Sequence, residues 1–358
     1  MTTNKELTVS KSERTGKIQT VLGLINPDDL GVTLAHEHSL IDLSCYFEMP
    51  EEATERWYVD QPVTMEILGS VMKRLFNNRD VGDLCDEKHQ TEEVYKYFLS
   101  GGNSLVDTTS IGIARDPLAL TRISRATGLN IIMGASYYVP LSYPDDIHEK
   151  PEQDITDSII KDVTVGVKDT GVKSGIIGEI GNFWPTNETS RKILRASAHA
   201  SVETGAAISI HPGGHPDALL QHLNDLIEAG ADPTRIIMGH LDVFPYAPEV
   251  VKEIAETGAT LEFDRFGSEN TNTPEEGGHD IAFPSDVQRI ERIEQLIEWG
   301  YENQIVVAQD VCLKTDLVSH GGGGYIHILD NIIPRMRKRG FSSENIDKIL
   351  IKNPKRIL

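Results

Sequence analysis

The chain alternates short apolar runs with longer segments in which apolar residues recur every three or four positions. The short runs have the length of buried strands, and the longer segments have the periodicity of amphipathic helices. We predict eight strands, at residues 31–42, 103–110, 130–138, 174–180, 206–211, 235–240, 259–263 and 304–311. Predicted helices lie between them at residues 116–128, 154–169, 190–204, 216–229, 248–257 and 286–299.

Boundary residues support these helices. Asp116 precedes Pro117, which is the pattern of an N-cap followed by proline at the first helical position, and Gly128 stands where that helix ends. The predicted helix at 286–299 has one apolar stripe, formed by Val287, Ile290, Ile293, Leu296 and Ile297.

Strands that alternate with helices indicate a parallel sheet, and eight such units close into a (β/α)8 TIM barrel. We therefore predict an α/β fold in which residues 1–358 form a single domain. A doubly wound open sheet is the alternative, and it is the weaker one because no Gly-x-Gly-x-x-Gly turn follows any predicted strand.

Two segments fall outside the repeating pattern. Residues 17–24 precede the first core strand and are predicted to form a short strand or hairpin arm. Residues 43–100 are too long for an ordinary connection and show helical periodicity at 65–76 and 91–99. We predict that residues 43–100 form a helical insertion between the first two strands.

The charge balance limits the classes of partner. The chain has 34 basic against 55 acidic residues, a formal net charge of −21, so we expect neither nucleic acid nor an anionic membrane as a partner. Residues 1–16 lack the apolar core of a secretory signal, and no apolar run approaches the roughly 18 residues of a membrane helix. Cys45, Cys85 and Cys312 are odd in number and scattered, which favours a reduced protein in the cytoplasm.

Histidines and carboxylates stand where five of the predicted strands end. His36 and His38 are separated by one residue, so on a strand both point to the same face, while Glu37 between them points to the opposite one. The fourth, fifth, sixth and eighth strands end in Glu179, His211, His240 and Asp310.

All strands of a barrel open onto one mouth at their C-terminal ends, so these side chains are predicted to converge there. Four imidazoles and two carboxylates form a ligand set suited to two divalent cations. An isolated buried histidine is more often a hydrogen-bonded core residue, and the coincidence over five strands is what favours a binuclear metal centre.

These residues, with several short motifs, resemble the phosphotriesterase family of the amidohydrolase superfamily, and within it the phosphotriesterase-related proteins. The resemblance covers the chain after about Thr15. The matching stretches are GKIQTVLGL (16–24), TLAHEH (33–38), GIIGEIG (175–181), IHPG (210–213) and DKILIKNP (347–354).

The resemblance implies that one metal is held by His36, His38 and Asp310, and the other by His211 and His240. In true phosphotriesterases a carboxylated lysine bridges the metals, whereas the related branch, like this chain, has a glutamate, here Glu179. This departure weakens any expectation of phosphotriesterase activity. Zinc is the first expectation for the two cations, and manganese, iron and cobalt stay open because such sites accept them all.

The expected chemistry follows from the metals. A water shared by two cations loses a proton near neutral pH, and the resulting hydroxide attacks a carbonyl. Asp310 is then positioned to accept the proton, and Asp242 is its proposed partner or, alternatively, an ordinary loop carboxylate. In the similar lactonases, residues at the positions of Tyr138 and Arg265 contact the substrate; the alternative for Arg265 is a salt bridge with Asp264 or a loop carboxylate.

We therefore predict a metal-dependent hydrolase of a small-molecule carboxylic amide or ester, such as an N-acyl amino acid or N-acetyltaurine, as in the related branch. Lactonase or weak phosphotriesterase activity is the alternative within the family. The hypothesis from another class is a non-catalytic protein that binds small molecules. The resemblance further suggests a homodimer.

Overall fold

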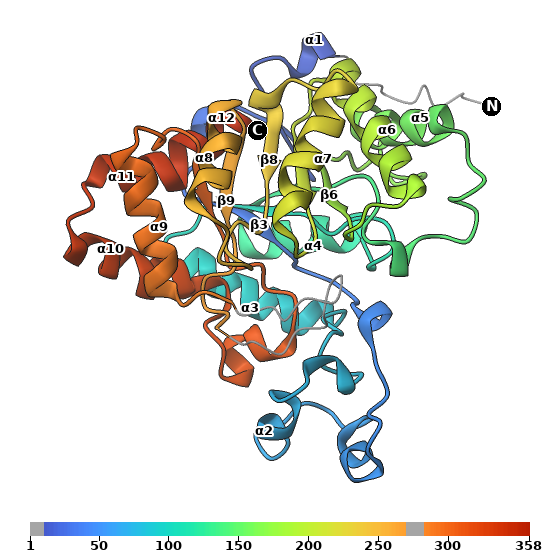
Figure 1. Cartoon of the computed structure of the whole chain (residues 1–358), viewed down its shortest axis with the longest axis vertical. Helices are drawn as coiled ribbons and strands as arrows, with labels where there is room; N and C mark the ends of the chain where they lie inside the picture. The colour runs from blue at the N-terminus through green and yellow to red at the C-terminus, as the bar shows by residue number, and fades with distance from the viewer. Residues whose placement is uncertain (1–10, 270–282) are drawn as a thin grey trace.

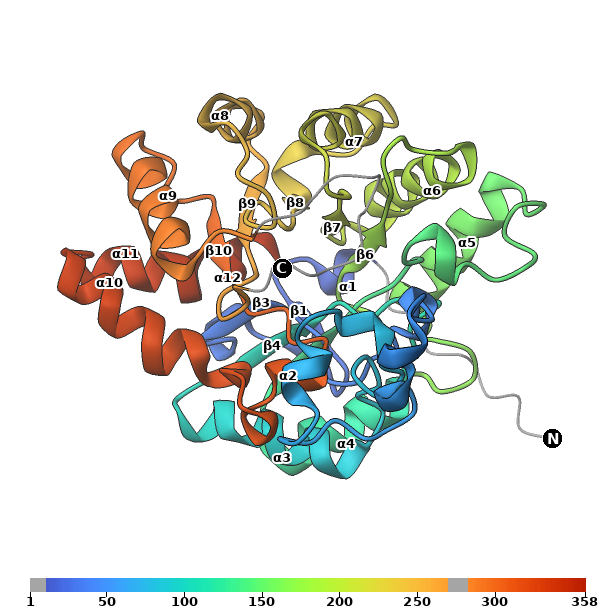
Figure 2. The same cartoon turned by 60° about the horizontal axis from the view of Figure 1, so that its bottom comes forward.

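Eight parallel strands form the centre of the protein, with helices around them (Figure 2). The computed structural model describes residues 11–269 and 283–358. The strands are β3 (Thr33–Glu37), β4 (Ser104–Asp107), β5 (Asn130–Met133), β6 (Ile177–Gly181), β7 (Ile208–His211), β8 (Ile236–Met238), β9 (Thr260–Phe263) and β10 (Ile305–Val307). They hydrogen-bond in two parallel groups, β3 to β5 and β6 to β10.

Backbone hydrogen bonds join the two groups into a ring. The N–H of Gly178 in β6 donates to the carbonyl of Ala135, just after β5, at 2.7 Å. On the other side, the N–H of Asp310 donates to the carbonyl of His36 in β3 at 3.3 Å. A Cβ atom at Gly178 would lie 2.3 Å from the carbonyl oxygen of Ser209, so this crowded position requires glycine. The closed ring confirms the predicted TIM barrel and excludes the open sheet.

The helices that cover the ring follow the predicted pattern closely. They are α3 (Glu87–Leu99), α4 (Pro117–Thr127), α5 (Glu152–Thr164), α6 (Glu188–Thr204), α7 (Pro216–Glu228), α8 (Pro248–Glu256) and α9 (Asp286–Glu298). Shorter helices are α1 (Lys11–Arg14), α2 (Leu68–Val71), α10 (Ile333–Arg339), α11 (Ser343–Asp347) and α12 (Asn353–Ile357). Among the residues described, no helix has the length and hydropathy to cross a membrane.

Local chemistry sets the helix ends. The Asp116 side chain accepts hydrogen bonds from the backbone N–H groups of Leu118 and Ala119, and Gly128 ends α4 in the left-handed conformation at φ 80°. The stripe of α9 is narrower than predicted. Val287 is 45% exposed, whereas the buried apolar residues are Ile290, Ile293 and Leu296.

The segment between β3 and β4 contains less helix than its periodicity predicts. The predicted helix at residues 65–76 is wrong in extent, because α2 covers one turn and a 3-10 turn follows at Leu75–Asn77. Asn78 holds the chain in a turn directly after this segment: its side-chain oxygen accepts from the N–H groups of Asp80 and Val81 at 3.1 and 3.0 Å, and its amide donates to the distant carbonyl of Tyr58 at 2.5 Å. The second predicted helix is the end of α3, the barrel's own crossover helix. In Figure 1 the segment around α2 projects beyond the barrel.

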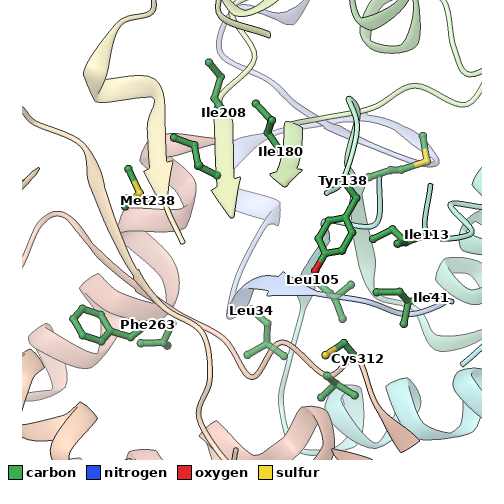
Figure 3. Packing of buried hydrophobic residues seen from close by; sticks show 14 of the residues in the cluster. Leu34, Ile41, Leu105, Ile113, Tyr138, Ile180, Ile208, Met238, Phe263 and Cys312 are labelled. Carbon is green, nitrogen blue, oxygen red and sulfur yellow. The ribbon is translucent and has the colours of Figure 1, made fainter. Parts of the chain in front are cut away.

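The end of the barrel away from the α2 segment is closed by the predicted hairpin, β1 (Ile18–Thr20) and β2 (Gly23–Ile25), which pair antiparallel. A small apolar cluster there combines Ile18 and Ile357 with strand residues such as Val106 and Ile237. A larger cluster packs the other strand faces against the helices, and Figure 3 shows several of its members.

Candidate metal centre

The structure brings all six predicted ligand residues together at the C-terminal mouth of the barrel. Glu179 lies between the imidazoles. Its Oε2 is 3.6 Å from Nε2 of both His36 and His38, while its Oε1 is 2.8 Å from His211 Nδ1 and 2.9 Å from His240 Nε2. All five side chains are buried. One carboxylate therefore faces two pairs of imidazoles, one pair with each oxygen.

Asp310 completes the group on the side of the first pair. Its Oδ1 lies 3.1 Å from His38 Nε2 and 3.8 Å from His36 Nε2. Within the described chain, donor atoms close enough to share one cation occur in three groups, each of which includes His36. The other members are His38 and Asp310, Glu179 and His240, or Glu262 and Asp264.

Outer partners orient the imidazoles. The Nδ1 atoms of His36, His38 and His240 lie 3.1 Å from Glu262 Oε2, 2.9 Å from Thr109 Oγ1 and 2.8 Å from Asp264 Oδ1, respectively. With Nδ1 engaged there, these three histidines present Nε2 to the centre, as metal-bound histidines do when a second group fixes the ring.

Glu262, Asp264 and Thr109 were not among the predicted site residues. Glu262 and Asp264 stand two residues apart at the end of the seventh predicted strand, the same spacing that singled out His36 and His38. That spacing was the available signal, and it places both carboxylates on one face. The role of Thr109 has no comparable signal in the sequence.

The donor set fits divalent cations. Two of its buried atoms, His36 Nε2 and Glu179 Oε2, have no hydrogen-bond partner among the described residues. Leaving a buried polar atom unpaired is costly, and a cation coordinated by both atoms would remove that cost.

The carboxylates at the centre are held ionised. Burial raises the pKa of Glu179, but His36 and hydrogen bonds from His211 and His240 outweigh it, and the pKa lies well below its usual range. Burial likewise opposes the ionised form of Asp310, whereas the Arg265 cation lowers the pKa of Asp310. An anionic ligand set attracts cations to this mouth.

Local backbone irregularities aim the ligands. The register of β3 against β4 shifts between Leu34 and Glu37, and bulges of this kind re-aim side chains beside active sites. His240 and Asp310 adopt the left-handed conformation at φ 55° and 49°, which costs a non-glycine residue about 1 kcal/mol or more. Glu37 points away from the centre, as predicted, and accepts from Gln309 and Val311 N–H, on either side of Asp310.

A pocket of about 660 Å³ opens above the metal-ligand group. Its apolar walls include Leu43, Tyr46 and Phe76 from the 43–100 segment. Tyr138, the predicted substrate contact, lines this pocket with its ring 5.4 Å from the His211 ring in an edge-on contact.

Arg265 also lines the pocket and is bound to Asp310. Its guanidinium lies 2.6 Å from Asp310 Oδ2 and donates to the Asp310 carbonyl at 2.9 Å, so Arg265 forms a salt bridge with a carboxylate of the turn after β10 and not with Asp264. Arg265 Nε is buried and has no hydrogen-bond partner in the described part of the chain.

Asp242 lies outside the ligand group. It accepts from the backbone N–H groups of Asp264 and Arg265 at 3.2 and 3.0 Å, and from Arg289 Nε at 2.8 Å. Burial raises the pKa of Asp242 to about 6, against the opposing effect of Arg289. Asp242 therefore holds the backbone that carries Arg265, and it does not touch Asp310.

Comparison with known proteins agrees with the resemblance drawn from the motifs. The model of the Phosphotriesterase family matches residues 16–358. N-acetyltaurine hydrolase of Dictyostelium discoideum is 41% identical over 367 residues, covering 97% of this chain and 99% of that protein. The human protein of the same name is 39% identical over 348 residues, again covering 97% and 99%.

Solved structures agree in fold. A resiniferatoxin-binding protein from Rhodobacter sphaeroides matches with a TM-score of 0.92 and 32% identity, covering 98% of this chain and 96% of the other. The phosphotriesterase homology protein from Escherichia coli, at 24% identity, has a TM-score of 0.75 and covers 92% of this chain and 99% of its own. The barrel, with its histidines and carboxylates at the mouth, and these matches lead to one conclusion: this chain belongs to the phosphotriesterase family, a family of divalent-metal-dependent hydrolases.

Proposed function

We propose that the chain is a binuclear metal hydrolase that cleaves the amide bond of a small N-acyl compound with an anionic end. Two divalent cations, zinc first among the candidates, would be held by His36, His38, Glu179, His211, His240 and Asp310. The observation that carries this proposal is the position of the Glu179 carboxylate, with one oxygen toward each pair of imidazoles. When bound, such cations supply activation of water and polarisation of the substrate carbonyl.

In this proposal, Asp310 transfers the proton and Arg265 provides a positive charge next to Asp310. Asp310 is the carboxylate that lines the pocket, so it receives the proton of the attacking water and passes it to the leaving amine. Arg265 binds Asp310 Oδ2 and leaves Oδ1 directed toward the imidazoles of His36 and His38.

The substrate class rests on the pocket and on the relatives. The similar proteins from Dictyostelium discoideum and human are named N-acetyltaurine hydrolases, whose substrate ends in a sulfonate. Arg265 is the one arginine or lysine among the described residues that line this pocket, and its unpaired Nε suits a sulfonate or carboxylate.

A binding protein without turnover is the second candidate. The similar Rhodobacter sphaeroides protein is named for binding resiniferatoxin, and the pocket of this chain has apolar walls. The filled set of six ligand positions favours the hydrolase over this candidate.

Turnover assays decide between these functions. The full chain, loaded with zinc or manganese, is assayed with N-acetyltaurine, an N-acetyl amino acid, a lactone and paraoxon. We expect amide cleavage, reduced about 100-fold or more in Asp310→Asn and unchanged in the exposed control Asp330→Asn. Turnover of the lactone or paraoxon alone would assign the alternative activities of the family, and tight ligand binding without turnover would favour the binding protein.

We also propose a homodimer that acts on its small-molecule substrate in the cytoplasm. Light scattering of the purified chain should give twice the monomer mass, and a monomer at micromolar concentration contradicts the dimer.

A further inference from the structure

A second cleft, of about 800 Å³, lies at the other end of the barrel. We call it the basic cleft, because its lining includes the cationic side chains of Lys11, Arg14, Lys17, Arg235, Lys355 and Arg356. Arg235 directly precedes β8 and His240 follows it, so the basic cleft and the metal centre lie at opposite ends of one strand, about 17 Å apart along it. Figure 1 shows α1 and α12 together at this end, away from α2.

The cations of the basic cleft are bound mainly by neutral groups. Arg14 donates to the Val163 carbonyl at 3.3 Å, and Arg235 to the Gly205 carbonyl at 2.8 Å. In the described ranges, no aspartate or glutamate lines the cleft, and Lys355 is the one lining cation that forms an ion pair with a carboxylate, that of Asp28. Asp28 and Asp232 offset this concentration of positive charge only in part, and it stands in a chain whose net charge is −21.

The arginines of the cleft are close enough to repel one another. Burial lowers the pKa of Arg14 to about 10, with a further contribution from Arg235. Burial also lowers the pKa of Arg235, where Arg356 adds to the effect and Asp232 opposes it. An anion bound in the cleft would offset this repulsion.

We propose that the basic cleft binds a small phosphorylated anion. Arginine forks match phosphate oxygens in two-pronged hydrogen bonds, and lysines add point charges. Arg14 and Arg235 are half-buried in this recess, and the acidic remainder of the protein repels polyanionic surfaces, so a small molecule fits better than nucleic acid or a membrane.

Helix capping alone is the competing explanation. Val163 lies in the last turn of α5 and Gly205 follows α6, so Arg14 and Arg235 also satisfy helix C-terminal carbonyls. Each of these two hydrogen bonds uses one N–H of a guanidinium that has five, which leaves donors for an anion. Capping alone predicts no saturable binding of phosphate.

Calorimetric titration of the metal-loaded full chain with inorganic phosphate and with pyrophosphate tests the proposal, at an ionic strength held constant with chloride. The cleft variant Arg14→Gln/Arg235→Gln should bind at least about tenfold more weakly than the native chain. The matched control Arg335→Gln/Arg337→Gln removes two exposed charges of α10 and should bind as the native chain does.

Equal binding by the native chain and the cleft variant would overturn the proposal, since the metal centre or an adventitious ion then accounts for it. Binding of anionic vesicles without phosphate binding would also overturn it. If the cleft variant does not fold, Lys17→Gln/Lys355→Gln serves instead, because both lysines line the cleft, and its phosphate affinity should fall about tenfold. None of these outcomes depends on amide hydrolysis, so this proposal and the proposed function fail separately.

Discussion

Glu179 connects the two halves of the proposed metal centre through a single side chain. Its Oε1 contacts His211 and His240, and its Oε2 faces His36 and His38. Its negative charge is the feature that a bridging ligand needs, since each cation then shares one carboxylate. Replacing Glu179 by a neutral side chain of the same shape tests the effect of the charge while the packing is kept.

The variant Glu179→Gln should therefore lose metal and activity together. We expect the bound metal to fall below the native content, and kcat/KM to fall by about 100-fold or more, since even outer partners of metal ligands contribute 10–100-fold. Elemental analysis and amide turnover measure the two effects. Glu188→Gln, at the first position of α6, is the control, and full metal with native turnover in Glu179→Gln would refute the bridging role.

His222 shows how one buried residue makes stability depend on pH. It is fully buried in α7 and its Nε2 lies 2.6 Å from Thr186 Oγ1. Burial lowers the pKa of His222 to about 3, with a further effect of Arg191. The folded protein thus keeps this imidazole neutral, while the unfolded chain binds a proton at its ordinary pKa of 6.5.

Stability from His222 is present above pH 6.5 and is lost as the pH falls toward 3, since in that range the unfolded chain binds the extra proton. We predict that the free energy of unfolding, measured in urea at pH 7.5 and pH 5, falls less in His222→Gln than in the native chain. His199→Gln, a half-exposed histidine of α6, should keep the native dependence. If the free energy of unfolding fell equally between pH 7.5 and pH 5 in the native chain and in His222→Gln, this pH dependence could not be assigned to His222.

At the scale of elements, the strands were predicted too long and the insertion too helical. The predicted strand at 130–138 continues past β5 into the loop that carries Tyr138, and the strand at 304–311 continues past β10 into the turn of Asp310. Apolar composition runs on through these loops because they are buried, so hydropathy does not mark where sheet pairing stops. At 65–76 the apolar residues are spaced as in a helix, yet the segment forms one helical turn and a 3-10 turn, and Asn78 stabilises the turn that follows.

The 43–100 segment forms one wall of the pocket, which gives it a testable effect on substrate binding. Truncating Phe76→Ala removes an aromatic wall but no group of the metal centre. We expect KM to rise about tenfold or more with kcat nearly unchanged, because uniform binding is lost. Met65→Ala, 78% exposed in the same segment, should leave both constants unchanged. A large loss of kcat with constant KM in Phe76→Ala would place Phe76 closer to the chemistry than the pocket wall.

At the scale of the whole molecule, the proposed cations would be coordinated by residues from opposite sides of the barrel. The proposed metal-ligating residues lie on β3, β6 and β7 and directly after β3, β8 and β10. The carboxylate of Glu179, on β6, lies between the histidines of the other strands. Ligands that bind only the folded state stabilise it by mass action. The metal centre is then part of the stability of the barrel as well as of its chemistry.

Removal of the metal should therefore destabilise the protein without unfolding it at room temperature. Binding at 100 times the dissociation constant contributes about 2.7 kcal/mol, which corresponds to a fall in Tm of a few degrees on chelation. Thermal unfolding before chelation, after it, and after return of zinc measures this effect, and zinc should restore the native Tm. Identical curves in all three states would exclude a tightly bound cation.

The sequence by itself determined the fold class, the family and the six ligand candidates, because eight alternating units close one way and the ends of parallel strands meet at one mouth. Only the tertiary structure decided which charges pair. Arg265 binds Asp310, Glu262 and Asp264 orient His36 and His240, and six cations gather in the basic cleft. Those contacts join residues from distant parts of the chain, and their partners depend on side-chain packing that no local pattern encodes.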